Sequence, residues 1–287
     1  MAAAFVHLHV HGPFSRMAGA STADALCARA AALGMQALAL TDRDTLSGAV
    51  PFLQACRRHG ILPVLGAEVT LAGGGQLVCL APDPAGYAAL CRLLSAAHLE
   101  HARNHPEVTL ARLEEEAPHL LALAGGRDGA VAQALLARRP QAAADLAAGL
   151  AGRFPGRFYL ELPADRLPGN RQLIRQLRAL AEHLRLPTVA TGDVHYATKE
   201  DAWISDLLAC VRLGCDLADM PPERAPQAFN AERYLKDAAE VALAVGDPAA
   251  CARSVEIAER CGPTLTLGGH RYPRFPLPGG EDPVRAL

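Results

Sequence analysis

Three histidines stand at alternating positions near the start of the chain, in the run HLHVH at residues 7–11. Alternate side chains of a β-strand lie on the same face, so a strand over 5–11 would gather all three imidazoles on one side. A buried imidazole needs partners for its polar ring nitrogens, and few structural arrangements supply them for three neighbours. Imidazole is a common ligand of zinc, iron and manganese-type ions, so the run favours a metal site.

Two further groups of ligand type stand at the ends of expected strands. Asp193 and His195 follow an expected strand at 188–191 and are again two positions apart, while Glu68 stands near the end of an apolar strand expected at 61–69. In α/β barrels the active site lies at the C-terminal ends of the strands, where these side chains would be. Each group is weak evidence by itself, because a glutamate at a strand end is most often simply solvated. Together with the histidine run, the evidence for a metal site is stronger.

Strand-like and helix-like segments alternate along the chain, which predicts a parallel sheet. The expected strands are 5–11, 37–40, 61–69, 76–81, 119–124, 158–162 and 188–191, and the expected helices are 21–34, 47–59, 83–98, 130–138, 141–153, 170–184, 201–211 and 248–261. About seven such units over 287 residues favour a closed α/β barrel over an open sheet. We expect residues 1–269 to form this barrel, and the Pro- and Gly-rich residues 270–287 to form a linker.

The composition narrows the class of protein. Hydrophobic residues make up 51% of the chain, enough for a large core, and the net charge is −2. A protein that binds nucleic acid over its whole surface usually has a basic excess, so here only a local basic patch remains open. The eight cysteines form no CxxC pair and are expected to be free thiols in a reducing cytoplasm. We identify no signal peptide and no apolar stretch long enough to cross a membrane.

The order of several motifs resembles a known family. HLHVH, LTDRDTLSGAV, GAEV, SAAHLE, ATGDVHYATKED and VEIAERC with RYPRFP resemble, in this order, the PHP (polymerase and histidinol phosphatase) domain of bacterial DNA polymerase III alpha subunits. The likeness runs from Phe5 to about Pro278, and FNAERYLKDAAEV together with TDRD is more similar to the error-prone branch. The resemblance implies a distorted (β/α)7 barrel, similar to a TIM barrel, that holds up to three metal ions.

The resemblance also implies a set of ligands. Carried over by position, the metal ligands of the family fall on His9, His11, Glu68, His98, Asp193 and His195. His7 lies one step before the first ligand pair, so we expect it to pack inside the barrel or to support the ligands from behind.

Three positions depart from the family pattern. An aspartate expected in the loop after the first strand is Ala18, the histidine of the TDH motif is Arg43, and an expected cysteine or histidine is Gly126. Arg43 is a permanent cation that would repel a metal ion and could instead pair with Glu68 or Asp193. Alternatively, Arg43 turns outward into solvent or binds a DNA phosphate.

The departures favour a mainly structural, docking role inside a polymerase, with a divalent metal (zinc, manganese or iron) at partial occupancy or absent. The expected partners are the remainder of a DNA polymerase alpha-type subunit, DNA through that parent protein, and other replication or repair subunits, with no membrane. The alternative is an active metal-dependent phosphoesterase, either a 3′–5′ exonuclease or a free-standing enzyme similar to histidinol phosphatases. Its ions would lower the pKa of a bound water to about 7. The chain has no aspartate cluster such as PDxDxDF, so it does not itself polymerise DNA.

Overall fold

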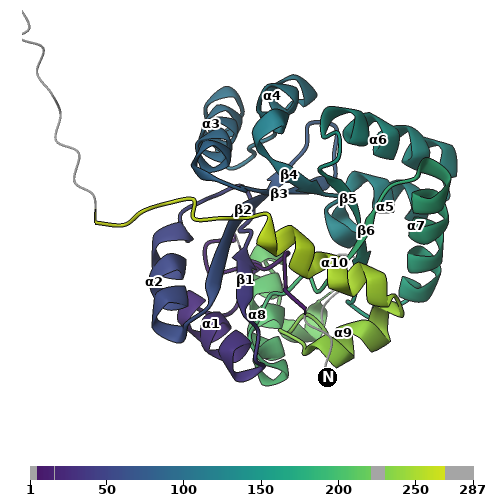
Figure 1. Ribbon diagram of the computed structural model, residues 1–287. Coiled ribbons are helices and arrows are strands. Elements are labelled where there is room, and N and C mark those ends of the chain that lie inside the picture. Colours follow the sequence, from purple (N-terminus) through teal and green to yellow (C-terminus); the bar gives the residue numbers. More distant parts are fainter. Residues whose placement is uncertain (1–4, 16, 221–229, 269–287) are drawn as a thin grey trace, which may run out of the picture.

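The computed structural model describes residues 5–15, 17–220 and 230–268. Within them, six strands form one sheet whose strands lie side by side in chain order (Figure 1). The strands are β1 (Ala37–Leu40), β2 (Leu62–Thr70), β3 (Gln76–Leu80), β4 (Leu121–Leu123), β5 (Phe158–Pro163) and β6 (Thr188–Thr191). The linker expected at 270–287 lies outside the described residues.

The sheet is only partly parallel, which corrects the expectation of a parallel sheet. β1 and β2 are parallel, as are β4, β5 and β6, but β3 is antiparallel to both of its neighbours. The connection from β2 to β3 is too short for the dozen or more residues that a parallel crossover needs. It turns at Gly73, Gly74 and Gly75, whose φ values of 92°, 100° and 85° lie where glycine alone is comfortable. A hairpin therefore joins the two successive strands that the sequence predicted here, and it makes them antiparallel.

The expected seven-stranded barrel is not confirmed, because residues 5–11 do not form a regular strand. Among the described residues this segment makes one isolated bridge, from Val10 to Val194. It still joins the two edges of the sheet, since the carbonyl of His7 accepts from the amide of Ala39 in β1, at 2.9 Å. Beyond β6, the amide of Val194 donates to the carbonyl of His9 at 3.0 Å. The histidine run is thus held between the first and last strands.

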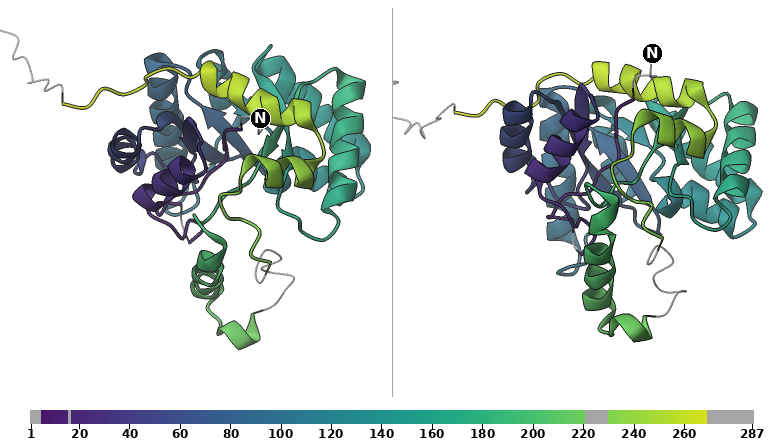
Figure 2. Two further views of the ribbon diagram at one scale, coloured as in Figure 1. Left: turned by 60° about the horizontal axis from the view of Figure 1, so that its bottom comes forward. Right: turned by 90° about the horizontal axis from the view of Figure 1, so that it is seen from below.

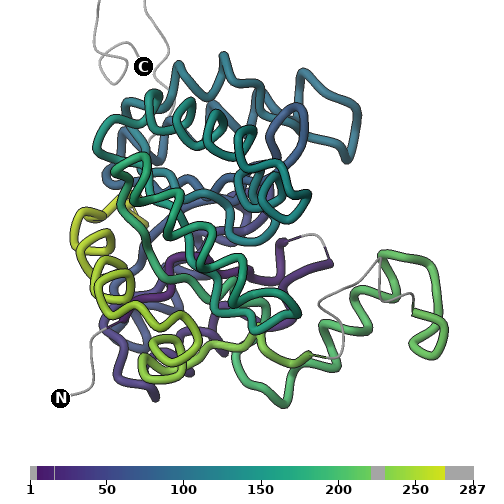
Figure 3. Tube along the Cα trace, turned by 90° about the vertical axis from the view of Figure 1, so that its right-hand side faces the viewer, coloured from purple at the N-terminus to yellow at the C-terminus, as the bar shows by residue number. Residues whose placement is uncertain are grey.

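Helices surround the sheet (Figure 1). They are α1 (Ala23–Ala32), α2 (Ala49–His59), α3 (Pro84–Glu100), α4 (Leu110–Glu116), α5 (Ala130–Leu136), α6 (Pro140–Arg153), α7 (Asn170–Leu184), α8 (Ala202–Leu213), α9 (Ala238–Val245) and α10 (Pro248–Glu259), with short 3₁₀ turns at Ala117–His119, Gly126–Asp128, Lys199–Asp201 and Leu217–Asp219. The sequence did not predict α4 and α9, each shorter than nine residues. Figures 2 and 3 show α8 projecting from the body of the molecule.

The core has two parts because strand side chains alternate between the faces of the sheet. Leu38 and Leu40 of β1 belong to the larger apolar cluster, together with Phe52 of α2. Ala39 belongs to a smaller cluster that includes Ile257 of α10. None of the helices among the described residues is both long and apolar enough to span a membrane.

Candidate metal site

The structure brings together five of the six ligands that the resemblance implied. Ligand atoms of His9, His11 and Glu68 lie within 4.8 Å of one another, and so do those of His11, Asp193 and His195. All five side chains are buried. They come from the segment before β1, from β2, and from the turn after β6, so segments far apart in the sequence meet at one site.

The rings of His9 and His11 are oriented through their Nδ1 atoms. Nδ1 of His9 donates to Oε1 of Glu161 at 3.0 Å. Nδ1 of His11 donates to the hydroxyl of Ser15 at 2.9 Å, because that hydroxyl itself donates to Oδ1 of Asp42 at 2.8 Å. This arrangement turns both Nε2 atoms inward. Neither makes a well-directed hydrogen bond with a described residue, but Nε2 of His9 lies 3.2 Å from Oε1 of Glu68 and Nε2 of His11 lies 3.3 Å from Oδ1 of Asp193. Carboxylates that hold a histidine in this way are typical of metal sites.

Arg43 pairs with Glu68, one of the two pairings expected from the sequence. Its Nε donates to Oε2 of Glu68 at 2.5 Å and its Nη2 donates to Gln76 at 3.2 Å. Burial disfavours the charged form of Glu68, but the guanidinium of Arg43 and the nearby histidines hold its pKa below the ordinary value. The Arg43 side chain is 22% exposed, so it does not turn outward as the alternative required.

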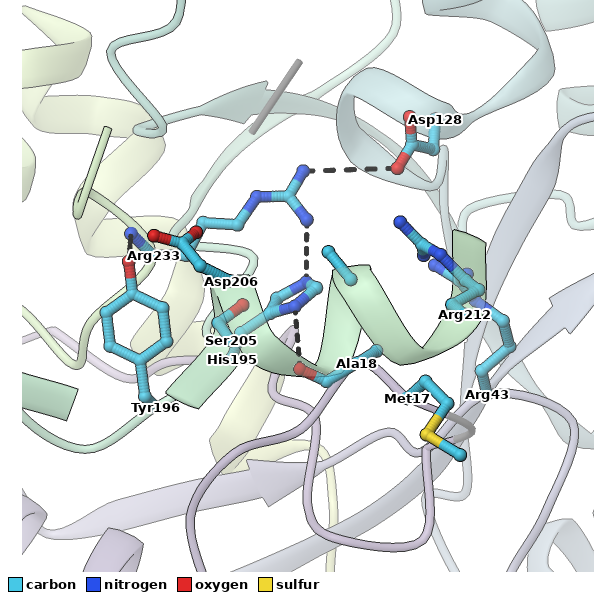
Figure 4. A pocket seen from close by; sticks show the side chains of 11 residues that line it. Met17, Ala18, Arg43, Asp128, His195, Tyr196, Ser205, Asp206, Arg212 and Arg233 are labelled. Atoms are coloured by element: carbon cyan, nitrogen blue, oxygen red, sulfur yellow. Dashed lines mark hydrogen bonds and ion pairs between the residues drawn. The ribbon is translucent and has the colours of Figure 1, made fainter. Parts of the chain in front are cut away.

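A second arginine occupies the other side of the site. Nη2 of Arg233 lies 2.9 Å from Oδ2 of Asp193. Nη1 donates to Nε2 of His195 at 2.7 Å (Figure 4). Nδ1 of His195 in turn donates to the carbonyl of Ala18 at 3.1 Å. Burial and the charge of Arg233 lower the pKa of His195 to about 3, so this ring is neutral. The lone pair that a metal would need on His195 is therefore taken by Arg233.

Electrostatics distinguish His9 from His195. Burial disfavours a charged His9, yet the charges of Glu161 and Asp193 outweigh burial and raise its pKa well above the ordinary value. Without a metal, His9 is therefore an imidazolium, with Nε2 lying 3.2 Å from Oε1 of Glu68. A metal ion at this nitrogen would have to displace that proton.

His98 and His7 lie elsewhere. Nε2 of His98, on α3, is 2.7 Å from the carbonyl of Asp44, and the structure does not bring this ring together with the other five ligands. Nε2 of His7 donates to the carbonyl of Lys236 at 2.9 Å. Gly192 is required beside His7, because a Cβ there would lie 2.7 Å from the ring.

The positions that depart from the family pattern border the site. Ala18 contributes only its carbonyl, to His195. A Cβ on Gly126 would lie 3.7 Å from Nδ1 of His9, so a side chain there would stand beside the ligands. The amide of Gly126 instead donates to Oε2 of Glu161 at 2.6 Å.

Two important residues were missed from the sequence. Glu161 lies inside the apolar strand FYLELP, and a carboxylate in such a strand could have suggested a buried role. Arg233 lies in residues 230–237, which precede α9 and form neither a helix nor a named strand, and no periodicity identifies it.

Comparisons with known proteins identify the family of the chain. A family model described as PHP domain matches residues 7–165, more than half of the chain. The error-prone DNA polymerase of Symbiobacterium thermophilum is 43% identical over 300 residues, which cover 99% of this chain and 27% of that protein. DNA polymerase III subunit alpha of Vibrio cholerae is 34% identical over 283 residues, 96% of this chain and 24% of that protein. The chain thus spans about a quarter of the length of the curated relatives it matches.

Among solved structures, endonuclease Q in complex with a 27-mer duplex substrate has a TM-score of 0.41 to this chain. The match is 13% identical and covers 67% of this chain and 49% of endonuclease Q. So distant a likeness carries no information about the substrate of this chain.

Proposed function

Because the chain belongs to the PHP domain family, we propose that it is the PHP domain of a DNA polymerase of the alpha-subunit or error-prone type, with an altered metal site. In this proposal its role inside the polymerase is mainly structural, and its partner is the remainder of that chain. DNA is reached through the parent protein, which would work in the bacterial cytoplasm with other replication or repair subunits. The observation that carries the altered site is the pairing of both acidic ligands with arginines, Arg43 with Glu68 and Arg233 with Asp193.

The residues present fit one divalent ion. The inward Nε2 atoms of His9 and His11, with a carboxylate oxygen of Glu68, form a donor set of nitrogen and oxygen that suits zinc, manganese or iron. Such an ion, when bound, would activate a water molecule and polarise a phosphoryl oxygen. Around it, Glu161 would hold the ring of His9, and Ser15 with Asp42 would hold that of His11.

Charge argues against a cluster of ions. Four buried carboxylates surround the site, Glu68, Glu161, Asp193 and, behind Ser15, Asp42, and two guanidinium groups already neutralise two of them. One divalent ion balances the remaining two negative charges, whereas two or three ions would leave an excess of positive charge in a buried space. We therefore expect weak or negligible phosphoesterase activity.

The alternative is an active metal-dependent phosphoesterase, either an exonuclease or an enzyme similar to histidinol phosphatases. The inward Nε2 atoms of His9 and His11 favour it, because they lie close to one another and to the carboxylates of Glu68 and Asp193, as the ligands of a metal ion would. It would require Arg43 and Arg233 to leave their carboxylates when ions bind.

The deciding experiment measures metal content and hydrolysis on the same sample. The purified chain is loaded with zinc or manganese, its ions are counted by mass spectrometry, and it is offered single-stranded DNA and a phosphomonoester. We expect at most one ion per chain and hydrolysis no faster than in the His11→Ala variant. Three bound ions, together with rapid hydrolysis that His11→Ala abolishes, would favour the alternative.

A further inference from the structure

A small cavity lies between the candidate metal site and α8, and three arginines line it. Its volume is about 60 Å³, and its wall includes Arg43, Arg212 and Arg233 together with Ser205 and Asp128. Figure 4 shows Arg212 and Arg233 reaching toward the same space from opposite sides, with Arg43 beside Arg212. Three guanidinium groups repel one another unless an anion lies among them.

Arg233 has donor capacity that the protein does not use. Its side chain is buried, yet neither Nε nor Nη2 makes a well-directed hydrogen bond with any described residue. Nη2 approaches Oδ2 of Asp193 to 2.9 Å as an ion pair, whereas Nε has no hydrogen-bond partner among the described residues. Buried N–H groups without an acceptor are costly, so a ligand with acceptor oxygens would be stabilised here.

Arg212 supplies a cation without a counterion of its own. It lies on the same face of α8 as Ser205 and Ala209, at helical spacing, and all three line the cavity. Within the described part of the chain, no hydrogen bond or ion pair engages its guanidinium. Burial and the charges of Arg43 and Arg233 lower its pKa, while Asp128 acts in the opposite direction. Arg212 therefore adds positive charge beyond the two arginines that already neutralise site carboxylates.

Two carboxylates also line the cavity. Oδ2 of Asp128 lies 3.9 Å from Nη2 of Arg233, at the limit of an ion pair. Asp206 has partners of its own. The wall is thus positive on the side of Arg212, and Asp128 competes with any anion for Arg233.

We propose that this cavity binds a phosphate group through Arg212 and Arg233, with Arg43 alongside and no metal ion required. The planar forks of arginine match the oxygens of a phosphate, and a phosphate presents acceptors in every direction. The cavity is several times larger than the roughly 10–15 Å³ that a single buried water molecule requires, so it admits a group larger than one water. The proposal rests on the proposed function, because Arg43 and Arg233 must stay at the site. The phosphate could be inorganic or belong to a nucleotide.

The test is calorimetric titration of the full 287-residue chain, freed of metal with EDTA, using inorganic phosphate as the probe. We expect binding by the wild-type protein, at least about tenfold weaker binding by Arg212→Gln, and about threefold or more tighter binding by Asp128→Asn. Arg139→Gln is the matched control, since Arg139 is exposed and lies at the start of α6. Thymidine 5′-monophosphate as a second probe distinguishes the sources, because tighter binding than inorganic phosphate would identify a nucleotide.

Two outcomes would overturn the proposal. One is the absence of phosphate binding by the metal-free wild type, or equal affinity in Arg212→Gln, whose fold is checked by circular dichroism. The other is phosphate binding that appears only after zinc or manganese is added, because the ion would then hold the phosphate. Metal content is measured on each sample. The proposed function fails only if ions are bound and hydrolysis is rapid, so its failure is distinguishable from failure of the phosphate proposal.

Discussion

The two halves of the candidate site present the same kinds of ligand but differ in what occupies them. In the half formed by His9, His11 and Glu68, neither Nε2 atom makes a well-directed hydrogen bond with a described residue, and Glu68 pairs with the partly exposed Arg43. In the half formed by His11, Asp193 and His195, the buried Arg233 forms an ion pair with Asp193 and donates a hydrogen bond to Nε2 of His195. We infer that the first half retains the capacity to bind a metal ion, whereas the second uses a cation of the protein itself.

The largest expected effect is on stability, from removing the cation of the second half. Arg233→Met leaves Asp193 buried beside neutral His195, and loss of one partner of a buried pair costs about 3–5 kcal/mol. Arg43→Met should cost less, about 2 kcal/mol, because water reaches its side chain and His9 remains beside Glu68. Unfolding in urea at pH 7 measures both. A greater loss of stability for Arg43→Met than for Arg233→Met would contradict this comparison of the two halves.

The second prediction concerns metal uptake by the first half. Arg43→His removes the guanidinium from Glu68 and supplies a neutral ring, so zinc affinity should rise at least about tenfold, with a higher melting temperature when zinc is present. Mass spectrometry and zinc titration measure this. Arg58→His, at an exposed arginine of α2, is the control. If the wild type already carries a full set of ions, and Arg43→His changes neither the zinc affinity nor the melting temperature, Arg43 does not substitute for a metal ion.

The third prediction tests the support behind His9. In the Arg43→His background, Glu161→Gln should weaken zinc binding about 10- to 100-fold, the usual effect of losing a carboxylate behind a metal-bound histidine. Glutamine can accept from either His9 or Gly126 but offers one of them an N–H group. Glu182→Gln, on the exposed face of α7, is the control. Equal zinc affinity in Glu161→Gln and Glu182→Gln would show that Glu161 does not support zinc binding.

Much of this arrangement could be predicted because ligand spacing follows strand geometry. The i, i+2 spacing of Asp193 and His195 after β6 indicated a shared site, and they lie together. Segments with a clear period, such as α7 with its buried apolar face, match the sequence closely. Periodicity gave the wrong prediction where the pairing partners of a segment, and not its own residues, decide its structure. Residues 5–11 are the example, because they form hydrogen bonds at both edges of the sheet.

Arg233 shows the other limit of the sequence. A cation is stabilised in a buried place by a carboxylate that lies 40 positions earlier in the chain, and nothing in the local pattern identifies that partner. The same is true of Gly126, whose amide meets Glu161 only once β4 and β5 are paired. Contacts of this kind depend on the assembled sheet.

The smallest expected effect compares Arg233 with Lys236, three residues later in the same segment. Arg233 has Asp193 at 2.9 Å and its pKa is raised, although burial opposes this. Lys236 is equally buried, but its nearest carboxylate oxygen, on Glu232, is 3.5 Å away. Burial therefore prevails and lowers the pKa of Lys236 to about 8.

A lysine whose pKa is lower in the folded than in the unfolded state makes stability rise with pH. The pKa of Lys236 is about 8 in the folded protein and 10.5 in the unfolded chain, so between these pH values the unfolded chain holds a proton that the folded protein has lost. The contribution of Lys236 to stability is therefore complete above this pH window and is lost as pH falls through about 8. Lys236→Met removes this titration. The stability of the wild type relative to Lys236→Met should therefore increase by about 1–2 kcal/mol from pH 7 to pH 9 in urea unfolding. A difference that stays constant over this range would show that Lys236 is solvated or better paired than its contacts imply, and burial alone would then not distinguish it from Arg233.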